Sequence, residues 1–297
     1  MTAVPLARTW GTMRIVALPL TRTPHPNARK LLNFYSYRII ASPKPTESSA
    51  PPRSFFTRWM PNEGLARWAS HKASRTWAEF GMAEKGTMKL RAFQLGERLM
   101  DRLDFEESNL KTIDLSIAPP SKKSQVSGSN AEEEWANTQV PLLYPPTVLS
   151  GPQSLENLKT LVEQRIPLHQ KGLATWIFFA ILSAPLKLIP IIPNFPFYFC
   201  AWRSWSHLKA LRTARYLEGL LGSNKIVPQP LKELNAVYSN PPPRAKLAGV
   251  GEDPTIVTRK ALERAMRVLT MEPEEAKELL RAHDQVVVRL KSASSAT

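Results

Sequence analysis

The feature that most constrains this chain is a thirty-residue apolar run at 173–202 that prolines interrupt. The run reads LATWIFFAILSAPLKLIPIIPNFPFYFCAW, and Lys187 is its only charged residue. Lys187 divides the run into stretches of 14 and 15 residues, and each is shorter than the roughly 20 apolar residues that a membrane-spanning helix needs. The interrupting prolines are Pro185, Pro190, Pro193 and Pro196. Because each removes a backbone hydrogen-bond donor, one straight helix through the run is not expected.

Three arrangements of this run fit the sequence: a re-entrant or monotopic hairpin that turns near 189–194, a single kinked span, and a buried helix pair in a soluble protein. Lys and Arg residues flank the run on both sides, before Gly172 and after Trp202. Basic flanks tend to stay on one side of a membrane. The pattern therefore favours the hairpin, with both flanks on the same side.

The residues after the run predict a helix that contacts a membrane. Asn194 is a suitable N-cap, Pro196 falls in the first turn, and Gly222 is a suitable end. Trp202 and Trp205 are followed by basic residues, an order typical of a helix in the lipid headgroup region. The alternative is an amphipathic core helix with a solvated basic face.

The rest of the sequence predicts a mainly α fold. Residues 13–20 read as a short strand, which would pair most economically with 140–149 in a small two-stranded sheet. Residues 27–37 and 88–103 read as helices. The predicted fold is therefore a helical protein with this small sheet and one proline-kinked membrane segment or re-entrant hairpin.

Composition divides the chain into successive regions. They are a short basic N-terminal segment at 1–12, an N-terminal helical region with a short strand at 13–118, a disordered linker at 119–139, a membrane-associated region at 140–238, a second linker at 239–253 and a C-terminal helical hairpin at 254–290. The linkers are assigned because they are rich in Pro, Ser, Gly and charged residues.

One dense acidic cluster precedes the first linker, formed by Asp101, Asp104, Glu106 and Glu107. Asp104 followed by Glu107 resembles a capping box that opens a short helix. Because the acids alternate with Arg98 and Arg102 at helical spacing, we interpret the cluster as a salt-bridged helix surface.

Motifs for enzyme chemistry are missing from the sequence. The five histidines stand far apart, without HxxxH or HExxH spacing, so no metal site is expected. The lone GxG at 249–251 has no strand before it, and neither a phosphate loop nor a GxSxG elbow occurs. Cys200 is the single cysteine, which excludes an internal disulfide and a cysteine-based metal cluster. We expect no catalytic residue, no cofactor and no enzyme activity.

The formal net charge is +15, and residues 1–46 carry seven basic and no acidic side chains. An Arg-rich, acid-free N-terminus is typical of mitochondrial targeting segments. Pro5 and Pro19 would interrupt an amphipathic targeting helix. Nucleic-acid binding is a further interpretation of the charge, but no recognisable binding module accompanies it.

Three stretches resemble the mitochondrial potassium–proton exchange-related family: MRIVALPLTR at 13–22, KLRAFQLGERLMDRLDFEESNLKTID at 89–114 and PLKLIPIIPNFPFYFCAWRSWSHLKAL at 185–211. The family's Gly–x–x–Leu–x–Asp–Arg motif falls on Gly96, Leu99, Asp101 and Arg102. Its Pro–Asn–x–Pro–Phe motif falls on Pro193, Asn194, Pro196 and Phe197. Its aromatic–Arg–x–Trp–Ser–His motif falls on Trp202, Arg203, Trp205, Ser206 and His207.

This resemblance implies a mitochondrial inner-membrane protein that is required for potassium–proton exchange and matrix ion homeostasis. The basic flanks of the apolar run predict that both termini lie on the matrix side of that membrane. The apolar run contains no acidic residue and only Lys187 as a charge, whereas proton-coupled transporters place ionisable groups near the membrane midplane. We therefore expect an accessory factor or subunit that does not form a complete ion path.

The expected partners are inner-membrane lipids together with protein partners in an ion-exchange complex or a second copy of the chain. Nucleic acid is not the expected partner. The alternative function is a basic peripheral adaptor that binds the mitochondrial ribosome or nucleic acid and uses the apolar run as a protein-contact helix.

Overall fold

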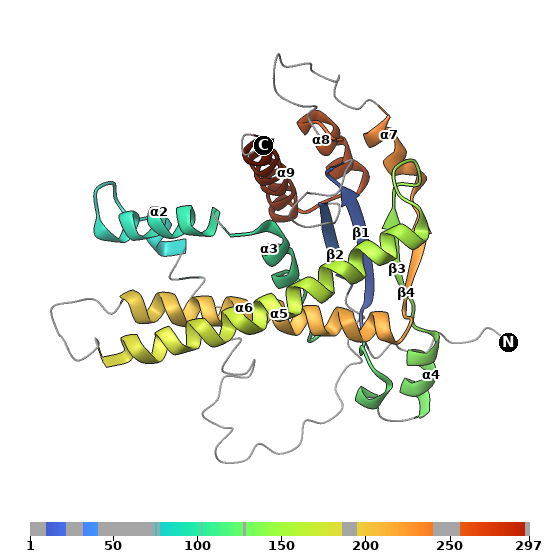
Figure 1. Ribbon diagram of the computed structural model, residues 1–297, viewed down its shortest axis with the longest axis horizontal. Coiled ribbons are helices and arrows are strands. Elements are labelled where there is room, and N and C mark those ends of the chain that lie inside the picture. The colour runs from blue at the N-terminus through green and yellow to red at the C-terminus, as the bar shows by residue number, and fades with distance from the viewer. Residues whose placement is uncertain are drawn as a thin grey trace. The chain divides into compact units, whose positions relative to one another are not determined.

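A computed structural model gives the fold of the chain (Figure 1). The structure describes residues 10–21, 32–40, 75, 78–101, 103–126, 129–185, 195–239 and 256–294. Most of these residues are helical, as the sequence predicts, and a mixed four-stranded sheet joins distant parts of the chain.

The chain forms two compact units, one of residues 43–103 and one of 1–42 together with 104–297. In the first unit, α2 (Met88–Asp101) confirms the helix predicted at 88–103. Gly96 lies within this helix and Asp101 is its last residue. All other elements described below belong to the second unit.

The sheet has the strand order β2-β1-β3-β4 (Figure 1). Its strands are β1 (Thr12–Pro19), β2 (Asn33–Ile40), β3 (Val140–Tyr144) and β4 (Ile226–Pro230). β1 pairs antiparallel with β2, and the pairs β1–β3 and β3–β4 are parallel. The predicted pairing of 13–20 with 140–149 is confirmed, whereas the prediction of only two strands is wrong.

The strand β2 corrects the helix predicted at 27–37 over the part that the structure describes. Phe34 and Tyr35 are adjacent and both buried, which is the pattern of a strand covered on two faces. Eight residues of this strand pair with β1, and this pairing outweighs the local helical pattern.

Side chains of β1 alternate between two cores, because successive residues of a strand point to opposite faces. Met13, Ile15 and Ala17 join a core with residues of the helices α5 (Gly151–Ser183) and α6 (Phe195–Gly222). Val16 and Leu18 join the other core, with residues of the helices α8 (Arg259–Val268) and α9 (Pro273–Ser294). Helices therefore cover both faces of the sheet.

The apolar run lies in a long helical hairpin formed by α5 (Gly151–Ser183) and α6 (Phe195–Gly222) (Figure 1). The two helices lie side by side and antiparallel, since His169 contacts His207 and Trp176 contacts Phe199. This arrangement excludes one kinked segment, whereas the hairpin and the buried helix pair both predict two such helices. The ends predicted for α6 are confirmed, while Asn194 lies outside the described residues.

The helix α5 continues through Pro167, although a proline usually ends or kinks a helix. Pro167 and Glu163 are both exposed. The carbonyl that Pro167 leaves without an intrahelical donor is four residues earlier, at Glu163. Water can bind this carbonyl on the exposed face, so the proline does not end the helix.

Among the described residues, no helix combines the length and the apolar character needed to cross a membrane.

The stretch predicted as a disordered linker at 119–139 instead contains the short helix η2 (Lys123–Gln125) and α4 (Ser129–Asn137). The Trp135 indole N–H donates to the carbonyl of Pro120 (3.1 Å), and the Lys225 ammonium lies 4.1 Å from the Trp135 ring centroid. These long-range contacts order a segment whose composition alone is typical of a linker. The second predicted linker, 239–253, falls outside the described residues except for Ser239.

The remaining helices pack on and around the sheet. They are α3 (Phe105–Lys111), η4 (Lys232–Leu234), α7 (Asn235–Tyr238), α8 (Arg259–Val268) and α9 (Pro273–Ser294). The helices α8 and α9 contact each other within the region predicted as a C-terminal helical hairpin, and α9 begins at Pro273. α8 begins later than Pro254, because the Thr258 hydroxyl caps it.

Candidate functional site

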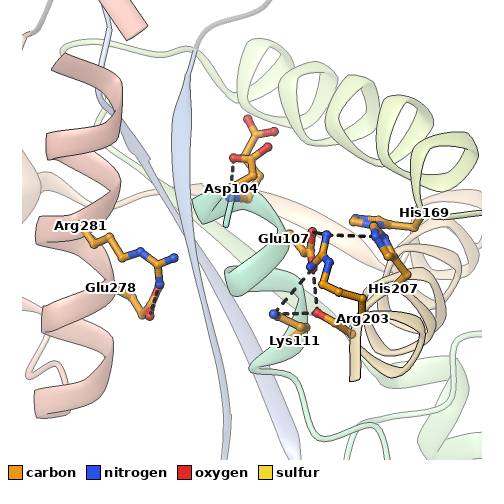
Figure 2. Close-up of polar contacts among 10 residues, drawn as sticks. Asp104, Glu107, Lys111, His169, Arg203, His207, Glu278 and Arg281 are labelled. Carbon is orange, nitrogen blue, oxygen red and sulfur yellow. Dashed lines mark hydrogen bonds and ion pairs between the residues drawn. The ribbon is translucent and has the colours of Figure 1, made fainter. Parts of the chain in front are cut away.

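A buried polar cluster lies where α3 meets the α5–α6 hairpin (Figure 2). We call it the histidine cluster, and its members are Glu107, Lys111, His169, Arg203, Ser206 and His207. Glu107, His169 and His207 are all buried. Three segments that are far apart in the sequence therefore bring these ionisable groups together.

The short helix α3 places Glu107 and Lys111 in the cluster. Asp104 is its N-cap, and its carboxylate accepts a hydrogen bond from the backbone N–H of Glu106 (3.2 Å). The predicted helix start is thus confirmed, but the Glu107 side chain contacts α6. Residues four apart share one face of a helix, so Lys111 lies beside Glu107 (3.7 Å between Nζ and Oε1).

The Glu107 carboxylate accepts three side-chain hydrogen bonds. Arg203 donates to both of its oxygens (2.7 and 3.4 Å), and the Ser206 hydroxyl donates to Oε1 (2.7 Å). Burial by itself raises the pKa of Glu107. The hydrogen bonds from Arg203 and Ser206, together with the charges of Arg203 and Lys111, hold this pKa below its usual value. Glu107 is therefore an ionised, buried carboxylate.

Lys111 completes the polar chain around Glu107. Its ammonium donates to the Ser206 hydroxyl (2.9 Å), which in turn donates to Glu107. Burial lowers the pKa of Lys111, because it disfavours the charged form.

The two histidines face each other across the hairpin. Nδ1 of His169 lies 3.1 Å from Nδ1 of His207, and Arg203 Nη2 lies 3.0 Å from Nε2 of His207. Arg203 can only donate, so Nε2 of His207 accepts and the proton of this neutral ring is on Nδ1. That proton is donated to Nδ1 of His169, which places the proton of His169 on Nε2.

Both imidazoles are neutral at neutral pH. Burial lowers the pKa of His169 to about 4, and it also lowers the pKa of His207. Nε2 of His169 is buried and has no hydrogen-bond partner within the described part of the chain. A buried donor of this kind is uncommon in folded proteins and calls for an explanation.

A second ionic group lies at the start of α3. Arg165 of α5 pairs with both Asp104 and Glu106, and Arg289 of α9 pairs with Asp104 (2.9 Å). The pKa of Asp104 is lowered, because the charges of Arg165 and Arg289 outweigh the effect of burial. Asp104, Glu106 and Glu107 of the acidic cluster are thus salt-bridged, as predicted, while the Asp101 side chain lies outside the described part of the chain.

The surroundings of this acidic cluster differ from the prediction, in which its acids lie on a helix surface and pair with Arg98 and Arg102. Glu106 and Glu107 are buried, and their partners come from other helices, Arg165 of α5 and Arg203 of α6. A sequence pattern within one helix does not reveal such tertiary pairs.

The structure places the predicted site residues in different parts of the chain. Arg203 and His207 belong to the histidine cluster, and Trp202 lies beside Arg203, whose guanidinium carbon is 5.8 Å from its ring centroid. Trp205 is exposed on α6, and Pro196 is in the first turn of this helix. The residues outside the described part are Lys187, Pro193, Asn194 and Arg102.

Sequence reasoning missed Glu107, Lys111 and His169 as members of one site. A search for histidines at short spacing fails here, because His169 and His207 are 38 residues apart on two helices. A weak signal exists for His169: it continues the buried stripe of Leu158, Leu161 and Arg165 at helical spacing.

The far end of the hairpin carries many exposed apolar side chains, which we call the hairpin tip. They are Ile177, Phe178, Phe179, Ile181, Leu182 and Tyr198. Farther along α6, the exposed Trp205 is followed by the exposed residues Lys209, Arg212 and Arg215. Apolar, aromatic and basic side chains thus follow one another along the hairpin, in the order expected from the sequence.

Comparison with known proteins identifies the family. Residues 14–221 match the family described as mitochondrial K+-H+ exchange-related. An uncharacterized protein of Saccharomyces cerevisiae is 26% identical over 171 residues, which cover 54% of this chain and 53% of that protein. An uncharacterized protein of Schizosaccharomyces pombe is 24% identical over 227 residues, covering 75% of this chain and 81% of that protein.

No solved structure matches the chain. The alignment spans about half the length of the budding-yeast relative. The family match covers most of the chain, including most of the strand β1, the helix α3 and all but the last residue of the α5–α6 hairpin. It confirms the resemblance carried by the three sequence stretches. The chain belongs to the mitochondrial K+-H+ exchange-related family.

Proposed function

We propose that the protein is an accessory factor or subunit of mitochondrial K+–H+ exchange and that it contacts the inner membrane through the hairpin tip. The family supports the link to K+–H+ exchange. The hairpin tip carries the proposal of membrane contact, because Phe178, Ile181 and Leu182 are 63%, 70% and 63% exposed.

Exposed apolar side chains that gather in one place mark a surface for a partner or a membrane. The residues beside the hairpin tip favour a membrane. Trp205 is a side chain typical of the lipid–water interface. Lys209 follows it by one helical turn, about 6 Å along the axis, at a level suited to anionic headgroups.

The composition of the hairpin tip supports an accessory role. Residues 172–202 contain no Asp, Glu, Arg or His, and Lys187 is their only charged side chain. Ionisable groups within a membrane usually mark the path of a transported ion or proton. A membrane-embedded hairpin tip therefore needs a protein partner, or a second copy, to complete such a path.

Extraction of mitochondria with alkaline carbonate tests the membrane contact. We expect the wild-type protein to stay with the membrane pellet. The double variant Ile181→Asp with Leu182→Asp should move into the supernatant. Val288→Asp is the matched control, since Val288 of α9 is 65% exposed and lies away from the hairpin. This control should remain in the pellet.

Release of the wild-type protein by carbonate, or by high salt alone, would contradict the proposal. Salt release would favour the peripheral adaptor instead, because electrostatic contacts weaken as the salt concentration rises.

A further inference from the structure

We propose that Glu107, His169 and His207 form a binding site for a divalent transition-metal ion of the zinc class. Each side chain offers one ligand atom, and these atoms all lie within 4.8 Å of one another. The three residues come from α3, α5 and α6, and all are buried (Figure 2). The site is independent of the proposed membrane contact, since none of these residues belongs to the hairpin tip.

The donor set fits such an ion. Two imidazoles and one carboxylate are a common set of protein ligands for zinc, with the fourth position left open for water. Imidazole nitrogen favours Zn²⁺ and its neighbours in the transition series over Mg²⁺ and Ca²⁺, which prefer oxygen. The donor set therefore points to a resident ion and not to the potassium of the exchange reaction.

The geometry of the histidine pair also fits. Two nitrogens that each lie about 2.1 Å from one tetrahedral zinc ion are about 3.4 Å apart. In the structure the two Nδ1 atoms are 3.1 Å apart. The separation of the two nitrogens therefore has to grow by only about 0.3 Å to match that of a zinc-bound pair.

A second observation concerns His169 alone. Its Nε2 is fully buried and has no hydrogen-bond partner among the described residues. The other nitrogen, Nδ1, meets only the ring of His207. An ion on Nδ1 of His169 therefore replaces no bond to a carboxylate or a backbone group, and Nε2 keeps its proton.

Gly172 holds the imidazole of His207 in place. A Cβ atom at Gly172 would come 2.8 Å from Nδ1 and Nε2 of His207. The absence of a side chain at this position lets the ring lie directly on α5, toward His169.

A cation already contacts two of the three ligands. The Arg203 guanidinium donates to Glu107 and to Nε2 of His207. An ion bound to Nδ1 of His207 moves the ring proton to Nε2. Two N–H donors, one of His207 and one of Arg203, then face each other without an acceptor. Arg203 and the metal ion therefore compete for the same two residues.

Arg203 has an alternative environment when an ion binds. Its guanidinium carbon lies 6.0 and 5.8 Å from the ring centroids of Trp176 and Trp202, a distance at which cations interact with aromatic rings. Its side chain is 13% exposed, so it can reach solvent. Competition predicts that removal of Arg203 strengthens metal binding.

The test uses the purified full-length protein after chelator treatment, titrated with Zn²⁺ and with Co²⁺ as a spectroscopic probe. We expect one bound ion per chain and the ligand-field absorption of a four- or five-coordinate Co²⁺ site. His169→Gln and His207→Gln should each weaken Zn²⁺ binding by more than about 10-fold. Arg203→Gln should strengthen it by a similar factor.

The control is His283→Gln, which removes a histidine of α9 whose Nε2 lies 3.1 Å from the carbonyl of Val257. This variant should bind Zn²⁺ like the wild type. Circular dichroism checks that each variant is folded. Arg203→Gln keeps all three ligands, so it decides the matter if a histidine variant unfolds. The proposal would be overturned if Arg203→Gln and the wild type bound Zn²⁺ equally. It would also be overturned if these two proteins bound Zn²⁺ no more tightly than His169→Gln.

Discussion

Gly172 of α5 lies directly against the imidazole of His207 of α6: a Cβ atom built on Gly172 would come 2.5 Å from Cε1 of this ring. Such a distance is shorter than any normal contact between two carbon atoms. The glycine therefore sets how closely the two helices approach at the level of the histidine cluster.

Gly172→Ala should lower the free energy of unfolding by about 1–3 kcal/mol, the usual cost of overpacking a closely packed core. The matched control is Gly222→Ala in α6, where a Cβ atom would meet nothing within 4 Å. Urea unfolding followed by circular dichroism measures both. Equal effects of the two substitutions would show that the contact with His207 does not determine the helix spacing.

Arg165→Met should cost about 3–5 kcal/mol, because it removes the guanidinium that pairs with the buried Glu106 carboxylate. The control is Lys123→Met. Lys123 forms an ion pair with Glu132 (3.2 Å) in which both side chains are largely exposed. A surface pair of this kind contributes about 0–1 kcal/mol. A loss below 1 kcal/mol for Arg165→Met would mean that the pair is not the buried ionic contact described here.

The Asp104 carboxylate should make stability depend on acid pH. Its pKa is lower in the folded than in the unfolded chain, so its contribution is present above the unfolded value of about 3.9. The contribution is lost as the pH falls through the lower folded value. The stability difference between wild type and Asp104→Asn should therefore be constant above about pH 5 and shrink below about pH 4. A difference that grows on acidification would contradict this assignment.

Pro167→Ala should stabilise the protein. Pro167 is exposed within α5, and a proline in a helix interior costs up to about 3 kcal/mol relative to alanine. The alanine restores a backbone donor for the carbonyl of Glu163. Thermal unfolding should move to a higher temperature, and a lower one would indicate that the proline sets a bend that the hairpin requires.

Short sequence patterns correctly predicted the features that depend on neighbouring residues, namely one strand and the ends of one helix. Residues 13–20 read as a short strand and form most of β1. Pro196 and Gly222 mark the two ends of α6, as predicted. The rule that a proline ends a helix failed at Pro167. This rule takes no account of whether the carbonyl that the proline leaves without a donor faces water.

Contacts between distant segments could not be predicted from these patterns. The parallel pairing of β3 with β4 joins strands separated by the whole α5–α6 hairpin. His169 and His207 meet only because that hairpin is antiparallel. In the same way, Glu107 looks like a helix-capping residue until α3 is placed against α6.

A direct measurement of K+–H+ exchange tests the proposed role. Mitochondria swell in potassium acetate when K+ enters in exchange for H+, since acetic acid crosses the membrane and water follows. Mitochondria without the protein should swell slowly, and the wild-type chain and Val288→Asp should both restore swelling. Leu182→Asp, at equal abundance in mitochondria, should not. Equal swelling with and without the protein, or full restoration by Leu182→Asp, would contradict a role in exchange that depends on the hairpin tip.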